Sequence, residues 1–230
     1  MSSDAFETSP RMVSIHAQLY ADGETTGRHS HGRGQLLAAA SGLMVATTAA
    51  GAWYVPADHA LWLPPGIDHD VAMRGAVRMT SAYIAPDACA AASGCKVLVT
   101  SRLLLAAIDA LAAEPVLYEE HGRGGHLAAL IVDEIGRAPD AALTLPMPSD
   151  RRLVRLCNAL IAAPDDRRGL DTWADAIGMS RRSLTRHFRA ETGLSLVAWR
   201  KRARSLHRFE PRRRAGVPFP LPGSGAHASA

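Results

Sequence analysis

The sequence predicts an α+β protein of more than one domain, with a β-rich first part, a helical middle part and an all-α last part. Short β-favouring runs alternate with turn residues up to about residue 86, and helical periodicity takes over from residue 97. The charge divides as well, since residues 1–150 carry a net −7 and residues 151–230 a net +11. Nucleic acid repels an acidic surface and attracts a basic one, so the last part is the candidate nucleic-acid binder.

Six short strands are expected in the first part, each separated from the next by glycine, proline or serine. Their spacing is typical of an all-β barrel or sandwich. The chain also reads as strand-like from residue 13, whereas residues 1–12 are expected to be loose. The expected strands cover residues 35–40, 43–48, 53–55, 60–63, 69–73 and 77–84.

Polar side chains occur among these strands at positions that one pocket could share. His29 and His31 are two residues apart, so on a strand they point to the same side. His69 follows a proline-glycine turn, and Gln35 lies close behind the first pair. Three imidazoles on one side of a barrel could hold a divalent metal ion. The neutral amide of Gln35, in place of a carboxylate, lowers the affinity of such a site for the ion. The alternative is that they line a small-molecule pocket or bond internally, without metal.

Aromatic side chains are candidates for the wall of the same pocket. Trp62 is the main candidate, with Trp53 and Tyr83 beside it. An apolar wall with a few convergent polar groups is typical of small-molecule sites. Packing in the core is the alternative for each of the three rings.

Two amphipathic helices are expected after the strands, over residues 97–113 and 124–137. Apolar residues recur there at spacings of three and four. These helices would pack on the strands of their own chain, pair with a second copy, or do both. Prolines between residues 139 and 148 predict a linker, and a further helix is expected from about residue 149.

A helix-turn-helix pattern follows in the basic part of the chain. A short helix with an apolar stripe ends at Gly178, Ser180 can cap a second helix, and Gly193 can end it. Leu184 and Phe188 of the second helix face inward. Two helices joined by a short turn with glycine are the usual form of this DNA-binding motif.

The outward face of the second helix is rich in arginine. Guanidinium groups neutralise phosphate and can donate two hydrogen bonds to guanine. A solvated basic face is the alternative, but the capped helix pair favours DNA binding. The expected DNA contacts are Arg181, Arg182, Thr185, Arg186 and Arg189.

Residues 173–204, WADAIGMSRRSLTRHFRAETGLSLVAWRKRAR, resemble the first helix-turn-helix of the AraC/XylS family of bacterial transcription regulators. His29-Ser-His31, Gln35 and residues 65–69 are similar to the two motifs of the cupin β-barrel. AraC-type regulators commonly sense an effector through such a barrel and often dimerise through the helices behind it. The resemblance therefore implies a transcription regulator. Its expected partners are double-stranded DNA, an unidentified small-molecule effector, a second copy of the chain and RNA polymerase.

The resemblance stops after Arg204, whereas members of the family continue with a second helix-turn-helix. We therefore expect an incomplete DNA-binding domain with one of the two motifs, and with Trp199 exposed for lack of a partner. Prolines and glycines in the tail predict disorder. The expected layout is a cupin-like ligand-sensing β-barrel (residues 1–96), a helical connector for dimerisation (97–138), a linker (139–149), a partial helix-turn-helix domain (150–208) and a disordered tail (209–230).

Further arginines near the end of the chain are expected to touch phosphate without reading sequence. Contacts of this kind weaken steeply with salt. The expected set is Arg200, Lys201, Arg202, Arg204 and residues 212–214. With half of the usual groove contact missing, the monomer is expected to bind DNA weakly.

Composition excludes several other classes. No apolar run is long enough to cross a membrane and the N-terminus lacks a signal-peptide core, so a cytoplasmic protein is expected. Cys89, Cys95 and Cys157 form no CxxC pair, so neither a disulfide framework nor a zinc knuckle is indicated. We expect no enzyme activity and no required cofactor. The alternatives are a metal-binding cupin enzyme and a truncated regulator with weak or no specific DNA binding.

Overall fold

The computed structural model describes residues 4–88 and 94–207. They form two units: the sheet unit, residues 4–48 and 53–144 without 89–93, and the helical unit, residues 49–52 and 145–207. The expected α+β class, with a β-rich first part followed by helices, is confirmed. The expected disordered tail, residues 209–230, lies outside the described residues.

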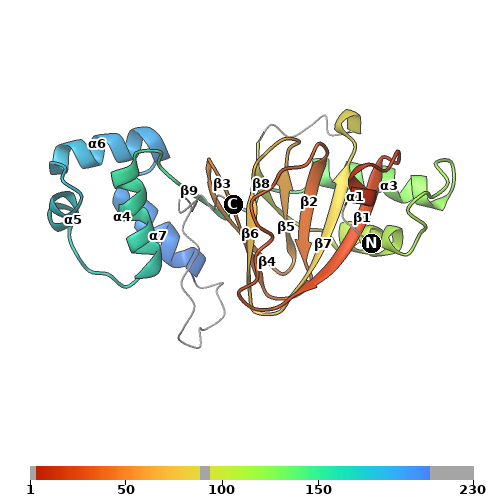
Figure 1. Cartoon of the computed structure of the whole chain (residues 1–230), viewed down its shortest axis with the longest axis horizontal. Coiled ribbons are helices and arrows are strands. Elements are labelled where there is room, and N and C mark those ends of the chain that lie inside the picture. Colours follow the sequence, from red (N-terminus) through yellow and green to blue (C-terminus); the bar gives the residue numbers. More distant parts are fainter. Residues whose placement is uncertain (1–3, 89–93, 208–230) are drawn as a thin grey trace, which may run out of the picture. The chain divides into compact units, whose positions relative to one another are not determined.

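The sheet unit is built on a five-stranded antiparallel sheet in the order β1-β7-β2-β5-β8 (Figure 1). A second sheet has the order β6-β3-β4-β9. The first sheet contains β1 (Val13–Tyr20), β2 (Gly34–Ala39), β5 (His59–Leu63), β7 (Val77–Ile84) and β8 (Lys96–Val99). The second contains β3 (Leu43–Thr48), β4 (Gly51–Pro56), β6 (Asp70–Arg74) and β9 (Thr144–Pro146).

Strand β2 lies at the centre of the first sheet and is buried on both faces. Successive side chains on a strand point to opposite faces, so Leu36 and Leu37 enter different clusters. Leu36 packs with the helix-side core that includes Leu104 and Ile131. Leu37 packs instead in an apolar core with Leu61, together with residues of β3, β4 and β6. The apolar run of β2 is therefore explained by burial on both sides.

Helices α2 (Arg102–Ala112) and α3 (Arg123–Arg137) cover the outer face of the first sheet (Figure 1). Their buried side chains recur at three and four, as in Leu104, Ala107, Ile108 and Leu111 of α2. Two short turns of helix, α1 (Asp4–Glu7) and η1 (Pro86–Ala88), complete the described helices of this unit.

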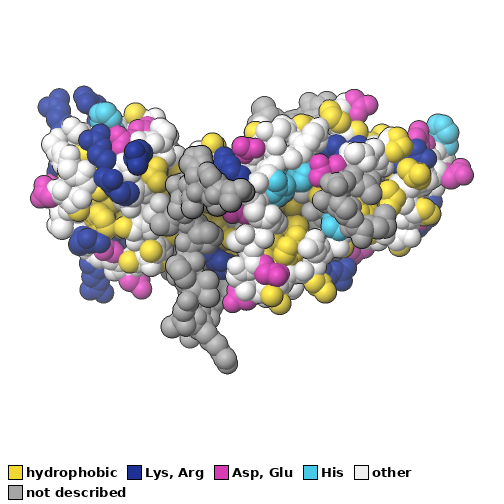
Figure 2. All heavy atoms as spheres, viewed as in Figure 1, with side chains coloured by type: hydrophobic (Ala, Val, Ile, Leu, Met, Phe, Trp, Pro, Cys, Tyr) yellow, Lys and Arg dark blue, Asp and Glu magenta, His cyan; other side chains and the backbone are white. Residues whose placement is uncertain are grey.

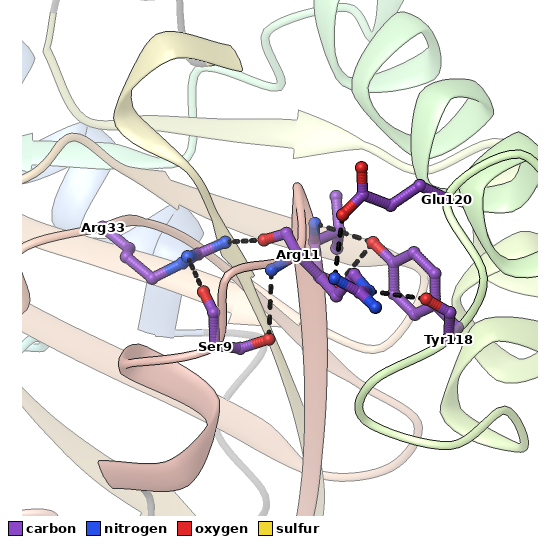
Figure 3. A network of polar contacts seen from close by, with 6 residues as sticks. Ser9, Arg11, Arg33, Tyr118 and Glu120 are labelled. Atoms are coloured by element: carbon purple, nitrogen blue, oxygen red, sulfur yellow. Dashed lines mark hydrogen bonds and ion pairs between the residues drawn. The ribbon is translucent and has the colours of Figure 1, made fainter.

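A buried guanidinium joins the N-terminal segment to the sheet. Arg33 donates to the carbonyl oxygens of Ser9, Arg11, Met12 and Tyr83 over 2.6 to 3.3 Å. Figure 3 shows how this network continues through Arg11 to the loop before α3, at Tyr118 and Glu120. The first residues are thus tied down, and the expectation that residues 1–12 are loose is wrong for the described residues from Phe6 to Met12.

The helical unit contains α4 (Arg151–Ala162), α5 (Leu170–Ala176), α6 (Arg181–Thr192) and α7 (Leu196–His207). Asp150 caps α4 and Ser180 caps α6, each through a side-chain oxygen that accepts a backbone N–H. Gly193 ends α6 in the left-handed conformation, with φ at 72°. The core is formed by Leu153, Leu156, Cys157, Leu160, Trp173, Leu184, Phe188 and Trp199.

All six expected strands are observed within two residues of their expected bounds. The expected helix over residues 97–113 is wrong at its start, because Lys96–Val99 forms β8 and pairs with β5. Thr100 N donates to Asp58 O over 3.2 Å, and Ser101 Oγ accepts from Leu104 N over 2.9 Å. Strand pairing and a serine cap therefore delay the helix to Arg102.

The expected exposure of Trp199 is also wrong. Its side chain is fully buried, at 0% relative exposure. The ring packs edge-on against Phe188, and its indole N–H is bonded to Pro146 O. The segment before α4 supplies the partner that a further domain was expected to supply.

Candidate functional site

A polar cavity of about 570 Å³ lies in the sheet unit. Its walls come from α1, β1, β2, β6 and β7 and from the loop before β2. The expected residues His29, His31, Gln35 and His69 all line it. Further lining residues are Glu7, His16, Gln18, Tyr20, Thr25, Thr26, Ser81 and Tyr83.

Three histidines converge in this cavity. His29 and His69 face each other across an isolated antiparallel bridge, with backbone N–O distances of 3.0 and 2.8 Å. Their ring centroids are 4.4 Å apart, and His31 lies 4.7 Å from His29 and 5.3 Å from His69. One nitrogen from each ring lies within 4.8 Å of the others. This spacing suits a single ion bound by all three.

The hydrogen bonds of the rings fix which nitrogen faces the cavity. Nδ1 of His29 lies 2.7 Å from Gly27 O, and Nδ1 of His69 lies 2.9 Å from Ile67 O. Nδ1 of His31 lies 2.7 Å from Glu7 Oε1. A carbonyl or carboxylate oxygen only accepts, so in the uncharged form of each ring Nδ1 carries the proton and Nε2 keeps its lone pair.

Buried acceptors without partners point to the same place. Nε2 of His31, Nε2 of His69 and Oε1 of Gln35 have no hydrogen-bond partner among the described residues. Buried polar atoms are normally bonded, so such a group calls for a ligand, an ion or a water. The cavity therefore presents three lone pairs that no donor of the described residues meets.

Burial favours the uncharged form of His31 and His69. It lowers the pKa of His69 to about 4, against the raising effect of the bond to Ile67 O. It also lowers the pKa of His31, although the Glu7 carboxylate acts in the opposite direction. In its uncharged form each ring can accept a hydrogen bond or coordinate a metal ion. Burial likewise raises the pKa of Tyr83 to about 12, so its phenol stays protonated.

The aromatic wall is only partly as expected. Tyr83 lines the cavity and meets the His31 ring edge-on at 5.1 Å. Trp62 is buried in the helix-side core and lines a separate cavity of about 150 Å³ under α3. Trp53 lies in the other apolar core, with Leu37. The structure thus does not bring Trp62 to the histidines.

Glu7 is a lining residue that sequence reasoning missed. It lies in a polar N-terminal stretch without periodicity, and its partner His31 is 24 positions away. No local signal in the sequence marks it. Its place depends on the fixed N-terminal segment described above.

A second candidate surface is the outer face of α6. Gly178, with φ at 68°, and Ser180 form the turn between α5 and α6, and Met179 N donates to Ala174 O over 2.9 Å. Leu184 and Phe188 are buried below. The expected set of Arg181, Arg182, Thr185, Arg186 and Arg189 is exposed and shares one surface. Figure 2 shows Lys and Arg side chains gathered on this unit.

These arginines differ in their partners. Arg181 Nη1 lies 3.1 Å from Asp171 Oδ2, with both side chains more than 60% exposed. Arg186 contacts its neighbour His187 at 3.1 Å. Arg182 and Arg189 form no ion pair within residues 4–88 and 94–207. The face is therefore mostly available to an anionic partner.

Arg200 is not available in the same way. Its guanidinium donates to the carbonyl oxygens of Asp166 and Arg168, the latter over 2.8 Å. Arg168 in turn lies 3.8 Å from the centre of the Trp173 ring. The expected phosphate contact by Arg200 is therefore not supported, since this arginine holds the loop before α5.

The family model described as AraC-like ligand binding domain matches residues 13–130. The chain belongs to the AraC-like ligand-binding domain family. The matched range contains His29, His31, Gln35 and His69, and it ends within α3.

Individual relatives of this AraC-like chain share little sequence identity with it. It is 29% identical to the HTH-type transcriptional regulator NimR of Escherichia coli K12 over 187 residues, 81% of this chain and 68% of NimR. A cupin superfamily protein from Desulfitobacterium hafniense is 23% identical, with a TM-score of 0.32 over 34% of this chain and 71% of that one. ToxT from Vibrio cholerae is 5% identical, with a TM-score of 0.40 over 84% and 80%.

No helix within the described residues is both long and apolar enough to cross a bilayer.

Proposed function

We propose that this chain is a transcription regulator that binds a small molecule in the polar cavity of the sheet unit and DNA through α6. Membership in the AraC-like ligand-binding domain family carries the first half of the proposal. The arginine face over a capped and buried helix supports the second half. A ligand that favours one arrangement of the molecule would thereby change how often DNA is bound.

The side chains of α6 suit the two tasks of a DNA-reading helix. Arg182 and Arg186 are four positions apart, so they lie on one side of the helix. An arginine that forks to the O6 and N7 of guanine contributes about 1–3 kcal/mol of discrimination. Arg189, one turn further along, would neutralise phosphate.

The DNA part is tested by selecting sites from a pool of random duplexes with the full chain. Arg182→Ala and Arg186→Ala should each relax the selected sequence and weaken binding about 5- to 150-fold, from the loss of one base contact. Arg137→Ala is the matched control, because Arg137 ends α3 and pairs with Asp133. Selection of the same sequence with the same affinity by the two α6 variants would contradict the proposal.

A second copy of the chain would present two such helices to DNA. We propose a homodimer on this ground, with α2 and α3 as candidates for the contact, since Leu103 of α2 is 51% exposed. Analytical ultracentrifugation of wild type and Leu103→Glu tests the dimer, and a wild-type monomer at working concentration would contradict it.

Contact with RNA polymerase is part of the proposed regulator function, and a single-round transcription assay tests this contact.

The three histidines support a second proposal, a divalent transition metal in the cavity. The donor set fits one: the three Nε2 atoms and the unbonded Oε1 of Gln35. Imidazole nitrogen with one oxygen favours zinc, nickel, cobalt, copper or iron over magnesium and calcium. When bound, such an ion supplies a Lewis-acidic point to which an oxygen-bearing effector can attach.

Metal content of untagged protein tests this second proposal. About one ion per chain in wild type, lost in His31→Ala and His69→Ala and kept in His126→Ala, would support it. His126 is a suitable control because it lies on α3, away from the cavity. Stoichiometric metal together with turnover of a substrate and no DNA selection would instead favour the cupin enzyme.

A further inference from the structure

One of the three histidines is held differently from the other two. The Nδ1 acceptors of His29 and His69 are carbonyl oxygens two residues earlier in their own loops. The Nδ1 acceptor of His31 is the carboxylate of Glu7, which lies on α1. The orientation of this ring therefore depends on the position of the N-terminal helix.

The contact between Glu7 and His31 is short and largely buried, so it can fix the orientation of the ring. The two atoms are 2.7 Å apart, and the His31 side chain is 6% exposed against 26% for Glu7. A carboxylate is acceptor-only, so it selects the ring form whose Nε2 is free to coordinate. A carboxylate behind a ligating histidine also raises the basicity of the ring and fixes its angle.

Neighbouring contacts keep Glu7 in place. The ring of Phe6 stacks on His16 with centroids 4.8 Å apart, and Phe6 O accepts from Ser14 Oγ over 2.5 Å. On the other side, Ser9 O accepts from the buried Arg33 over 2.8 Å. Glu7 thus lies between two anchored positions on the cavity rim.

We propose that Glu7 is a positioning residue for the metal-binding histidines, and that a bound ion and the docked N-terminal helix stabilise each other through His31. The inference rests on the metal proposal above. Coupling between two binding events is reciprocal, so a contact that tightens metal binding is itself tightened by metal to the same factor. Partners of this kind typically change metal affinity about 10- to 100-fold.

The test is a zinc titration of the full chain against a chelating indicator. Glu7→Ala should bind zinc about 10- to 100-fold more weakly than wild type. Glu7→Gln should fall between the two, because its amide oxygen still accepts from Nδ1 but carries no charge. Glu120→Ala is the control, since this carboxylate also pairs with the N-terminal segment, at Arg11, but lies outside the cavity.

Hydrogen exchange of residues 4–9 with and without zinc gives a second readout that a merely structural role would not move. Zinc should slow exchange there in wild type and Glu120→Ala, and leave it unchanged in His31→Ala and Glu7→Ala. Far-UV circular dichroism of the zinc-free variants checks that each is folded.

The two proposals fail in distinguishable ways. If wild type binds none of zinc, nickel, cobalt, copper and iron, the metal proposal is wrong and so is the role of Glu7, while the DNA experiment is unaffected. If wild type binds zinc and Glu7→Ala binds it equally well, without any change in exchange, only the role of Glu7 is overturned.

Discussion

The indole N–H of Trp199 donates to the carbonyl oxygen of Pro146 over 2.7 Å. The same ring meets Phe188 edge-on, with centroids 5.9 Å apart and planes at 89°. One side chain of α7 thus joins the segment before α4 to the helix that carries the arginine face. This relationship fixes the outward direction of α6 from beneath.

Trp199→Ala should therefore destabilise the helical unit by about 3–5 kcal/mol, through loss of buried aromatic surface. Trp199→Phe should destabilise the unit less, because phenylalanine keeps most of the buried aromatic surface. It loses one hydrogen bond, worth about 1 kcal/mol, and leaves a small cavity. Hydrogen exchange of α6 amides in increasing urea measures both. Val197→Ala is the control, since Val197 is 64% exposed and should stay within about 0.5 kcal/mol.

Two glycines of α3 should respond in opposite directions to alanine. A Cβ on Gly124 would lie 2.5 Å from the Tyr118 ring, which is held by bonds between its hydroxyl and the backbone of Val13. Gly124→Ala should cost about 1–3 kcal/mol by overpacking. Gly136 has open space at its Cβ position, so Gly136→Ala should stabilise by about 0.5–1 kcal/mol. Urea titrations followed by circular dichroism compare the two, and equal effects would contradict the clash.

Arg33 should not tolerate lysine. Its guanidinium donates to four carbonyl oxygens in directions that a planar fork can reach and a single ammonium cannot. Arg33→Lys keeps the charge but leaves buried carbonyl oxygens without a donor. This should lower the free energy of unfolding by about 1–3 kcal/mol. The N-terminal segment should also become cleavable at Arg11, so limited trypsin digestion is the measurement. Arg28→Lys is the control, because Arg28 is an exposed residue of a weak ion pair. Equal cleavage of the two variants would argue against the anchoring role of Arg33.

Much of both sites could be predicted from local spacing. The pair His29 and His31 and the caps of α6 are set by neighbours within a few residues, and the structure places them as expected. The position of Trp62 could not be predicted, because it depends on register. Trp62 pairs with Leu36 while Leu63 pairs with Gln35, so Trp62 points to the face opposite the cavity.

Other differences arise from partners far away in the chain. Lys96–Val99 directly precedes the apolar spacing of α2 and was expected to begin that helix, but pairing with β5 makes it a strand. Trp199 is covered by Pro146, 53 positions earlier. Glu7 reaches His31 only because Arg33 and Phe6 fix the segment around it. Contacts of this kind leave no periodic trace in the sequence.

Arg186 and Arg200 should separate DNA binding from stability. Arg186 is exposed on the outer face of α6, so Arg186→Ala should weaken DNA binding while changing stability by about 0.5 kcal/mol or less. Arg200 donates to two carbonyl oxygens of the loop before α5, so Arg200→Ala should destabilise the helical unit by about 1–3 kcal/mol. Thermal melts and DNA titrations on the same samples compare them. A stable Arg200→Ala variant with weakened, less salt-dependent DNA binding would restore the phosphate role.

The start of α4 should lose stability in acid. Hydrogen bonds from the Arg152 side chain and backbone lower the pKa of Asp150 from 3.8 to about 2. A bond from Asp150 N, with others from Ser149, lowers the pKa of Glu191 of α6. A carboxyl group whose pKa is lower in the folded state than in the unfolded state stabilises the folded protein at pH values above the unfolded-state pKa. This stabilisation is lost as the pH falls through the folded-state pKa. The Asp150→Asn, Glu191→Gln double variant should therefore melt below wild type at pH 6, and the gap in Tm should close as pH falls from about 4.5 toward 2. A gap that stays constant over this range would show that neither carboxylate stabilises α4 through its charge.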